Sequence, residues 1–257
     1  MCLLRQLKPN SIVIAVSAIL QARMNSTRFP RKSLYPLAGI PLTEHIINRI
    51  KAVTDFDHVI LAIPDSPSEK PLVEMAQRLN ITIAKGPEED VLERFIIAAD
   101  QVKAQHIIRI CGDNPLVDRQ LIRLLINSHL KENADYTITP DSIPLGTGTE
   151  VVKVKALKNI AQITTEPKYR EHVTTWFQDN PTAIAKCLVP APSYLINKHH
   201  RLTVDTKQDM ALMEKIFDEF YTYSSRVPNL EKIIQFLDAR PDLAQINADT
   251  PQKNWRS

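Results

Sequence analysis

A short segment near the amino end of the chain concentrates side chains that bind anions. Between Gln21 and Lys32 the sequence places three arginines, one lysine and two hydroxyl groups, namely Arg23, Arg28, Arg31, Lys32, Ser26 and Thr27. Such cations can hold the roughly four negative charges of a nucleoside triphosphate through several hydrogen bonds. The segment has no glycine, which excludes the dinucleotide-binding fingerprint and the P-loop. A solvated basic loop is the alternative interpretation.

Two aspartates follow short apolar runs further along the sequence. Asp113 stands in Cys111-Gly-Asp-Asn-Pro-Leu116, and Asp205 follows Arg201-Leu-Thr-Val204. A divalent ion bound together with phosphates needs only one or two carboxylates, so both aspartates are candidate Mg²⁺ ligands. The alternatives are an Asx turn at Asp113 and a helix N-cap at Asp205, with Thr206 and Asp209 forming a capping box.

Charge and composition narrow the class of protein. The 257 residues include 44% hydrophobic and 24% charged residues, which is typical of a soluble globular protein. The first acidic residue is Glu44, and six basic residues precede it, so the positive charge is local and favours a small anion over nucleic acid. Three separated cysteines indicate a reducing compartment, and we expect a cytoplasmic protein. The longest apolar run, Ile12–Leu20, is too short to span a membrane.

The first half of the chain alternates between two hydrophobic patterns. Short apolar runs predict strands over 12–20, 58–63, 81–84 and 106–111. Helical spacing and capping residues predict helices over 42–53, 70–79, 88–102 and 118–131. This order predicts an α/β fold with a mostly parallel sheet and helices on both faces. Ligands of such sheets bind outside the carboxyl ends of the strands, where the basic segment and Asp113 fall.

The second half is less regular. We expect a loop over 141–149, an antiparallel strand over 150–154, helices over 155–163 and 168–178, strands over 183–189 and 201–204, and a helical carboxyl terminus. No linker or repeat divides the sequence, so residues 1–257 are predicted to form one domain. Its core would cover about 11–222, with a small lobe for acceptor binding or dimerisation over about 140–200 and a helical extension over 223–257.

Five segments together resemble one enzyme family. They are Ala18-Ile-Leu-Gln-Ala-Arg-Met-Asn-Ser-Thr-Arg-Phe-Pro-Arg-Lys32, Gly86-Pro-Glu-Glu-Asp-Val-Leu-Glu-Arg94, Arg109-Ile-Cys-Gly-Asp-Asn-Pro-Leu116, Tyr169-Arg-Glu-His-Val-Thr174 and Leu202-Thr-Val-Asp-Thr206. In this order they resemble the cytidylyltransferases of the spore-coat polysaccharide type, which are related to the synthetases of CMP-sialic acid and CMP-KDO.

The resemblance implies a nucleotide-diphospho-sugar transferase fold, similar to the GT-A and Rossmann folds, and transfer of CMP from CTP to a sugar. A sugar hydroxyl, expected to be the anomeric one of an acidic sugar, would attack the α-phosphate in line and release pyrophosphate. Catalytic residues would be Arg23, Arg28, Lys32 and Asp113, with Mg²⁺ bound by Asp113 and Asp205. Nucleotide contacts would come from Ala18, Arg23, Ser26, Arg28, Lys32, Gly86, Asp90 and Arg94. The acceptor sugar would meet Glu150, Arg170 and His172, and two copies of the chain could form a homodimer.

Some features leave alternatives open. The family usually has glycine where this chain has Asn25 and Arg31, which would alter nucleotide binding if Arg31 needs positive φ. A glycosyltransferase of similar fold is one rival, although Asp113-Asn114 does not match its usual Asp-x-Asp motif. A nucleotide-binding protein without turnover is the other. A buried histidine on a helix is the alternative for His172. Cations that could bind an acceptor carboxylate are Arg170, His172, His199, His200 and Arg201.

Overall fold

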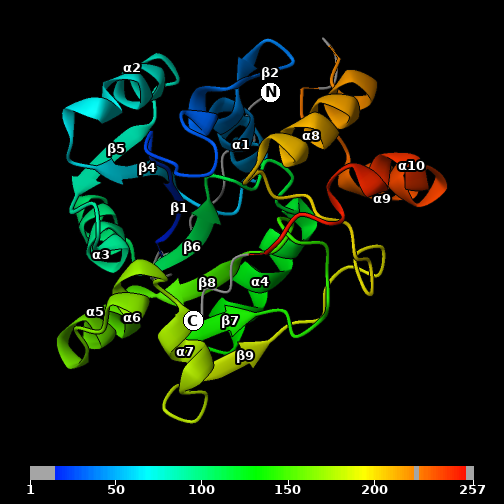
Figure 1. Cartoon of the computed structure of the whole chain (residues 1–257). Helices are drawn as coiled ribbons and strands as arrows, with labels where there is room; N and C mark the ends of the chain where they lie inside the picture. Colours follow the sequence, from blue (N-terminus) through cyan, green and yellow to red (C-terminus); the bar gives the residue numbers. More distant parts are fainter. Residues whose placement is uncertain (1–14, 223–225, 253–257) are drawn as a thin grey trace, which may run out of the picture.

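A seven-stranded sheet organises the protein in a computed structural model that describes residues 15–222 and 226–252. The strand order is β5-β4-β1-β6-β8-β7-β9, as the fan of arrows in Figure 1 shows. Their bounds are β1 Val16–Gln21, β4 His58–Pro64, β5 Thr82–Gly86, β6 His106–Cys111, β7 Tyr136–Ile138, β8 Glu150–Lys153 and β9 Lys186–Leu188. Only β8 pairs antiparallel with its neighbours β6 and β7, so the predicted mostly parallel sheet is confirmed.

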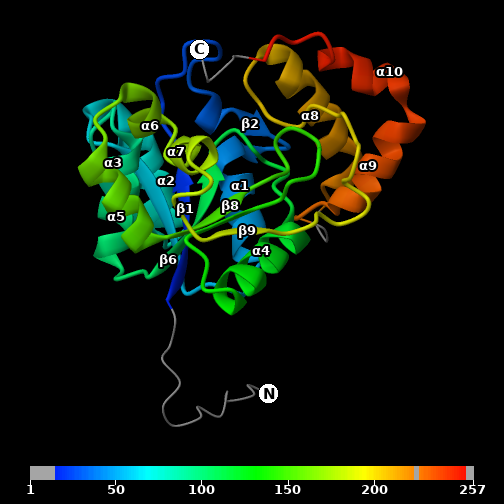
Figure 2. The ribbon, with the colours of Figure 1, turned by 90° about the horizontal axis from the view of Figure 1, so that it is seen from below.

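Helices cover both faces of this sheet, which is visible in the view of Figure 2. One apolar core packs under α1 (Leu42–Lys51), α2 (Lys70–Arg78), α4 (Arg119–Lys131), α8 (Lys207–Phe220) and α9 (Leu230–Ala239). The other packs under α3 (Val91–Gln101), α5 (Val154–Ile163) and α7 (Thr175–Asp179). Because neighbouring residues of a strand point to opposite faces, apolar runs such as β1 feed both cores.

Side-chain caps set several helix starts. Asp90, Asp118 and Asn229 accept backbone N–H groups at the starts of α3, α4 and α9. The helix predicted from about residue 88 therefore begins at Val91, since Asp90 is its N-cap. The capping box before α8 is also present, with Thr206 as the N-cap and Asp209 as its partner, while Asp205 lies one residue earlier.

Two expectations for the second half need correction, and one strand was missed. The helix predicted over 168–178 is two short helices, α6 (Pro167–Glu171) and α7, separated by Val173 at φ +36°. The strand predicted over 201–204 forms a single bridge, between Arg201 and Leu145. Strand β7 was not predicted, because three residues are too few for a visible alternation. Residues 12–14 of the strand predicted over 12–20 lie outside the described residues.

Shorter elements complete the described chain. A small hairpin joins β2 (Pro36–Leu37) to β3 (Ile40–Pro41), and η1 (Lys32–Leu34) and η2 (Pro67–Glu69) are single turns. The expected helical carboxyl terminus is α9 followed by α10 (Pro241–Ala244) and η3 (Gln245–Asn247). None of the helices in the described ranges is both long and apolar enough to cross a bilayer.

Candidate active site

A pocket of about 300 Å³ opens at the carboxyl ends of β1 and β6, where ligands of parallel sheets are expected. The basic segment, the turn after β6, the start of α3 and the end of α6 contribute to its wall. Polar and charged lining residues are Gln21, Arg23, Ser26, Thr27, Arg28, Lys32, Ser33, Glu88, Glu89, Arg94, Arg109, Asp113, Glu171, His172 and Asp205.

Two buried apolar side chains, Met24 and Phe29, anchor the basic segment. The Met24 N–H donates to both carboxylate oxygens of the buried Glu69, at 3.2 and 3.0 Å, and the Met24 carbonyl accepts from Ser26 and Arg31. With its apolar residues inside, the segment directs Arg23, Ser26, Thr27 and Arg28 to the pocket. This is an anchored loop that lines a pocket, which disfavours the interpretation as a merely solvated one.

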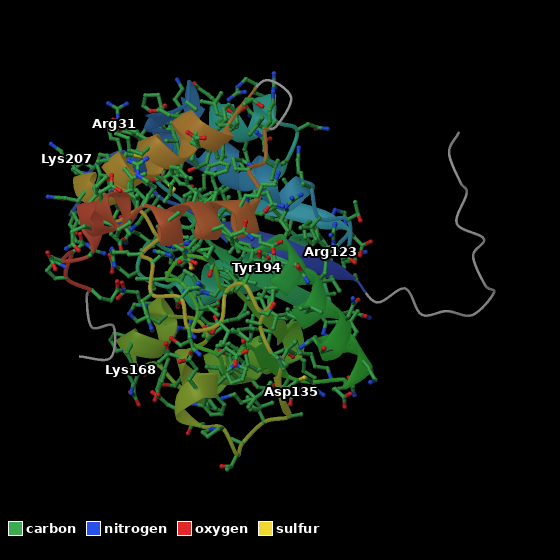
Figure 3. The ribbon with its side chains drawn as sticks, turned by 90° about the vertical axis from the view of Figure 1, so that its right-hand side faces the viewer. Arg31, Arg123, Asp135, Lys168, Tyr194 and Lys207 are labelled. Atoms are coloured by element: carbon green, nitrogen blue, oxygen red, sulfur yellow. The ribbon has the colours of Figure 1, made fainter. Side chains whose placement is uncertain are left out.

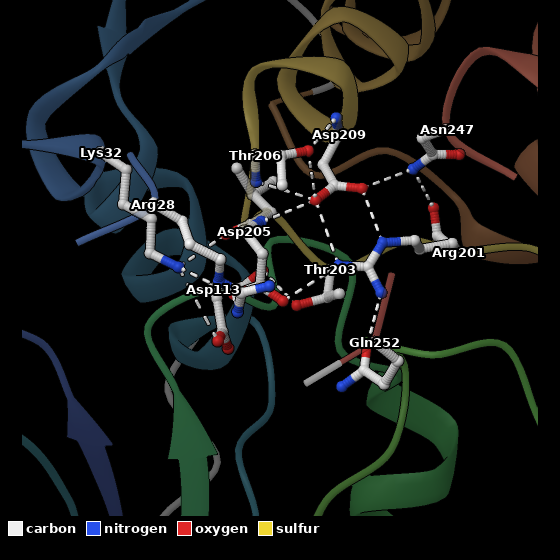
Figure 4. A network of polar contacts seen from close by, with 11 residues as sticks. Arg28, Lys32, Asp113, Arg201, Thr203, Asp205, Thr206, Asp209, Asn247 and Gln252 are labelled. Atoms are coloured by element: carbon white, nitrogen blue, oxygen red, sulfur yellow. Dashed lines mark hydrogen bonds and ion pairs between the residues drawn. The ribbon is translucent and has the colours of Figure 1, made fainter. Parts of the chain in front are cut away.

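Both aspartates meet at the ammonium group of Lys32. Its Nζ lies 3.9 Å from Asp113 Oδ2 and 3.4 Å from Asp205 Oδ1 (Figure 4). It also donates to the carbonyl of Val204 at 2.6 Å. Arg28 Nη2 lies 2.8 Å from the same oxygen of Asp205. Two residues 92 positions apart in sequence therefore share one small region with two cations of the basic segment.

Backbone hydrogen bonds bring Asp205 to this place. The Val204 N–H donates to the carbonyl of Asp113 at 2.8 Å, and the Leu202 N–H donates to Leu145 at 2.7 Å. A Cβ on Gly146 would lie 2.5 Å from Leu202 and Thr203 backbone atoms, so glycine lets the two segments approach. On the other side, a Cβ on Gly112 would lie 2.5 Å from the carbonyl of Gln21. The turn after β6 is thus held between β1 and residues 201–204.

The environment shifts the acidity of groups in the pocket. Burial raises the pKa of Asp113, Lys32 opposes this, and the charge of Asp205 adds to it. Burial also raises the pKa of the Cys111 thiol, to about 11. A raised pKa disfavours the thiolate form of Cys111, which is the nucleophilic form of a cysteine.

The two carboxylates fit a divalent ion that also binds phosphate. Across residues 15–222 and 226–252, no group of three or more His, Cys, Asp or Glu side chains is arranged to hold a metal ion by itself. Mg²⁺ beside phosphates needs less, since one or two carboxylates and several waters suffice. Asp113 and Asp205 supply hard oxygen donors that already face one cation, the ammonium of Lys32.

Comparison with known proteins identifies the family. The sequence model for cytidylyltransferases matches residues 17–250, which include all residues that line the pocket. The chain belongs to the cytidylyltransferase family. The spore coat polysaccharide biosynthesis protein SpsF of Bacillus subtilis strain 168 is 32% identical, over 88% of this chain and 95% of that protein.

Solved structures share the fold of this cytidylyltransferase-family chain. A cytidylyltransferase from Leptospira borgpetersenii superposes with a TM-score of 0.84 at 21% identity, covering 90% of this chain and 97% of that one. The CMP:2-keto-3-deoxy-manno-octonic acid synthetase in complex with CTP gives a TM-score of 0.62 at 16% identity, covering 80% and 99%. The fold and the resemblance expected from the five motifs are thereby confirmed.

The residues assigned to the base or ribose lie at different depths in this cytidylyltransferase-family structure. Arg94 lines the pocket although it is buried, and its Nη1 donates to the carbonyls of Pro87 and Glu88 at 2.6 and 2.7 Å. Its Nε, also buried, has no hydrogen-bond partner. Gly86 and Asp90 do not line the pocket. A Cβ on Gly86 would lie 2.8 Å from Arg94 Cγ, so this glycine makes room for the arginine.

Of the three residues assigned to the acceptor, only His172 lines the pocket. It is half-buried at the end of α6, which does not fit the alternative of a buried helix histidine. Arg170 instead forms an ion pair with Asp90, with Nε 2.7 Å from Oδ2, and lies 3.8 Å from Glu93. Glu150 does not line the pocket; it is buried in β8, where four side chains donate to it.

Arg109 is a pocket residue that the motif analysis did not assign. Its Nη1 lies 3.0 Å from Glu150 Oε2, directly across the β6–β8 pair, and 3.4 Å from Thr174 Oγ1. Its Nε is buried without a partner. Sequence offered a signal, because an arginine inside an otherwise apolar strand needs a buried partner or a ligand.

Ala18 and Arg31 lie outside the pocket. Ala18 is fully buried in the middle of β1, so its assigned nucleotide contact is not supported. Arg31 has φ +59°, the positive φ considered above for a position where the family usually has glycine. Its side chain is exposed at the edge of the molecule (Figure 3). Asn25 is not among the described residues with positive φ.

Of the other cations considered for an acceptor, His200 pairs with Asp238 and Arg201 with Asp205 and Asp209.

Proposed function

We propose that this protein transfers CMP from CTP to a sugar hydroxyl, releases pyrophosphate and uses Mg²⁺ as its cofactor. The observation that carries the proposal is the meeting of Asp113 and Asp205 at Lys32, inside a pocket lined by two further arginines of the basic segment. The CMP:2-keto-3-deoxy-manno-octonic acid synthetase, which shares this fold, was solved in complex with CTP, and this supports CTP as the nucleotide.

The cations of the basic segment bind the triphosphate. Arg28 and Lys32 now neutralise Asp205 and Asp113, and both line the pocket, so we expect phosphate oxygens to replace these carboxylates as their partners. When phosphates take these cations, the two carboxylates become available to a divalent ion. We therefore expect metal and nucleotide to bind together, with weak metal binding in the absence of nucleotide.

The reaction is an in-line displacement at the α-phosphorus. The sugar oxygen forms a bond to this phosphorus as the bond to the bridging oxygen of pyrophosphate breaks, and the hydroxyl proton passes to water. Arg23, Arg28 and Lys32 stabilise the charge that develops on the leaving pyrophosphate, while the pocket wall holds the reactants in line. Mg²⁺ held by Asp113 and Asp205 supplies further neutralisation of phosphate charge.

The acceptor in this proposal is an acidic sugar for surface polysaccharide or glycan synthesis. His172 and Arg109 line the pocket with two side chains that can meet a carboxylate, and Arg109 is at present paired with Glu150. A small lobe over about 140–200 that binds the acceptor, a homodimer and a cytoplasmic location stay predictions.

Release of pyrophosphate from CTP, in the presence of Mg²⁺ and a panel of neutral and acidic sugars, tests the proposal. We expect turnover with CTP and an acidic sugar, and at least tenfold less with ATP, GTP or UTP. Asp113→Asn should lower kcat by about 100-fold or more without unfolding the protein. Asp100→Asn, which alters an exposed aspartate of α3 outside the pocket, is the matched control.

Two results would contradict the proposal. Consumption of a sugar nucleotide, with CTP ignored, would show a glycosyltransferase. Retention of CTP without turnover on any acidic sugar, together with unchanged binding in Asp113→Asn, would show a nucleotide-binding protein.

A further inference from the structure

Asp205 is held from two sides by different groups. Arg28 and Lys32 approach one carboxylate oxygen from the pocket, while Arg201 approaches the other from behind, with Nη2 3.0 Å from Oδ2 (Figure 4). Side-chain exposure differs accordingly, at 39% for Arg28 and 8% for Arg201. Arg28 can therefore exchange its partner, whereas Arg201 is a fixed support; Lys32, at 13%, lies between them in exposure and is also bonded to the Val204 carbonyl.

Asp209, in the first turn of α8, fixes both Arg201 and the backbone around Asp205. Its Oδ1 accepts from Arg201 Nε at 2.7 Å, and its Oδ2 accepts from Arg201 Nη2 at 3.2 Å. The same Oδ2 accepts the backbone N–H groups of Asp205 and Thr206, each at 2.9 Å. Asp209 is fully buried, so its charge depends on these donors.

The carboxyl-terminal segment completes this support from about 40 residues further along the chain. Asn247, in η3, is 2% exposed, and its Nδ2 donates to Asp209 Oδ1 at 2.8 Å and to the Arg201 carbonyl at 3.0 Å. Gln252 Oε1 accepts from Arg201 Nη1. Figure 4 shows Asn247 above Arg201 and Gln252 below its guanidinium group, so the two amides hold this arginine from opposite sides.

We propose that Asn247 and Gln252 are positioning residues for Asp205, acting through Arg201 and Asp209. The proposal rests on the proposed function, because it assigns a role toward the metal ligand Asp205. Apolar contacts of Leu243 and Ile246 already attach this segment to the core, so attachment alone does not require a buried amide. A buried polar group is costly unless bonded, and groups behind a ligand orient it, often with a 10- to 100-fold effect on metal affinity.

Mn²⁺ binding to the whole protein in the presence of CTP, followed by electron paramagnetic resonance, tests this role. Asn247→Ala should weaken Mn²⁺ binding about tenfold. It should raise the Mg²⁺ concentration for half-maximal activity by a similar factor, while kcat at saturating Mg²⁺ stays within about twofold. Leu243→Ala is the control, since it loosens the same segment through its apolar contacts and should leave Mn²⁺ affinity unchanged.

The outcomes separate this inference from the proposed function. Equal Mn²⁺ affinity in Asn247→Ala and Leu243→Ala, with the wild type binding Mn²⁺ normally, overturns the inference alone. A wild type that binds CTP but no Mn²⁺ overturns the metal site and the inference together. If Asn247→Ala does not fold, Gln252→Ala is the deciding variant, because Gln252 is exposed and its loss should not unfold the protein. We expect Gln252→Ala to bind Mn²⁺ about threefold more weakly than the wild type. Unchanged Mn²⁺ affinity in this variant overturns the proposal.

Discussion

Two sets of carboxylates in this molecule are neutralised in opposite ways. Asp113 and Asp205 are paired with Arg28 and Lys32, long side chains that reach across the pocket. Glu150 is buried in β8 and accepts from Tyr136, Gln178, Arg109 and Thr174. Every lone-pair direction of Glu150 is used by a fixed neighbour, which is typical of a structural group. The comparison separates carboxylates with oxygens that face pocket cations, although Arg201 also supports Asp205 from behind, from a carboxylate whose oxygens are all held by fixed neighbours.

The strongest way to break this comparison is to remove the cation shared by the two aspartates. Lys32→Met should lower kcat/KM for CTP by about 10³-fold, because a buried charge that stabilises the leaving group is lost. The free energy of unfolding should change by only about 1 kcal/mol, since Asp205 keeps Arg28 and Arg201 and the side chain of Asp113 is partly exposed. Steady-state kinetics and urea unfolding measure both.

Lys85→Met is the control for Lys32→Met, because Lys85 is an exposed lysine paired with Asp65 outside the pocket. Activity of Lys32→Met within threefold of this control would remove Lys32 from the site.

Glu150 should show the reverse behaviour. Glu150→Gln leaves the guanidinium of Arg109 buried without a counter-charge, so the free energy of unfolding should fall by about 3 kcal/mol. Asp113→Asn should change the free energy of unfolding by under about 1 kcal/mol in either direction, because the carboxylate it removes is partly exposed and its pKa is already raised. Urea unfolding of both variants, with Arg109→Met combined with Glu150→Gln as a control that removes both charges, measures the difference. Equal losses for the two single variants would contradict the distinction.

A buried pair at the other end of β6 sharpens the comparison through pH. His129 Nε2 lies 2.9 Å from His106 Nδ1, and its Nδ1 lies 2.7 Å from Thr137 Oγ1. Burial, with the charges of His106 and Lys153, lowers the pKa of His129 to about 3. The unfolded chain therefore binds the proton first, and stability that is present above pH 6.5 is lost as the pH falls toward 3.

From pH 6.5 to 5 this histidine should remove about 1.5 kcal/mol from the free energy of unfolding. His129→Gln keeps a polar side chain that does not titrate. Between pH 6.5 and 5 its free energy of unfolding should therefore fall by about 1.5 kcal/mol less than that of the wild type. Chemical unfolding at the two pH values measures it, and identical pH dependence in the variant and the wild type would contradict the assignment to His129.

Local pattern was enough to predict every described strand of the sheet except β7, and β8 is antiparallel as expected. β4 and β6 appear where apolar runs bounded by polar residues predicted them, because strands buried on both faces have no polar alternation. Residues 201–204 follow the same pattern, yet they form one bridge, since Leu145 and the turn at Asp113 take up their backbone hydrogen bonds. Such long-range partners leave no trace in local sequence.

The candidate site shows the same limit. The basic segment could be recognised from composition alone, but the approach of Asp205 to Asp113 depends on the bond from Val204 N–H to the Asp113 carbonyl. The assignment of Glu150 to the acceptor failed to foresee its buried partners, because Tyr136 comes from β7, whereas Gln178 lies in α7 and Thr174 is the N-cap residue of that helix. Tertiary packing, which brings such groups together, decides whether a carboxylate is structural or free to bind.

The smallest expected effect concerns Arg31, a cation of the basic segment that lies outside the pocket. Arg31→Gly removes a side chain held at φ +59°, where a non-glycine residue costs about 1 kcal/mol, but it also makes the unfolded chain more flexible by a similar amount. The free energy of unfolding should therefore change by less than about 1 kcal/mol. The affinity of Arg31→Gly for CTP should stay within about twofold of the wild type. Arg28 is a neighbouring cation that does line the pocket, so Arg28→Gln should weaken CTP binding about tenfold. Calorimetric titration of both variants with CTP compares them. Equal weakening would mean that Arg31 turns into the pocket on binding and that the whole cationic segment acts on the nucleotide.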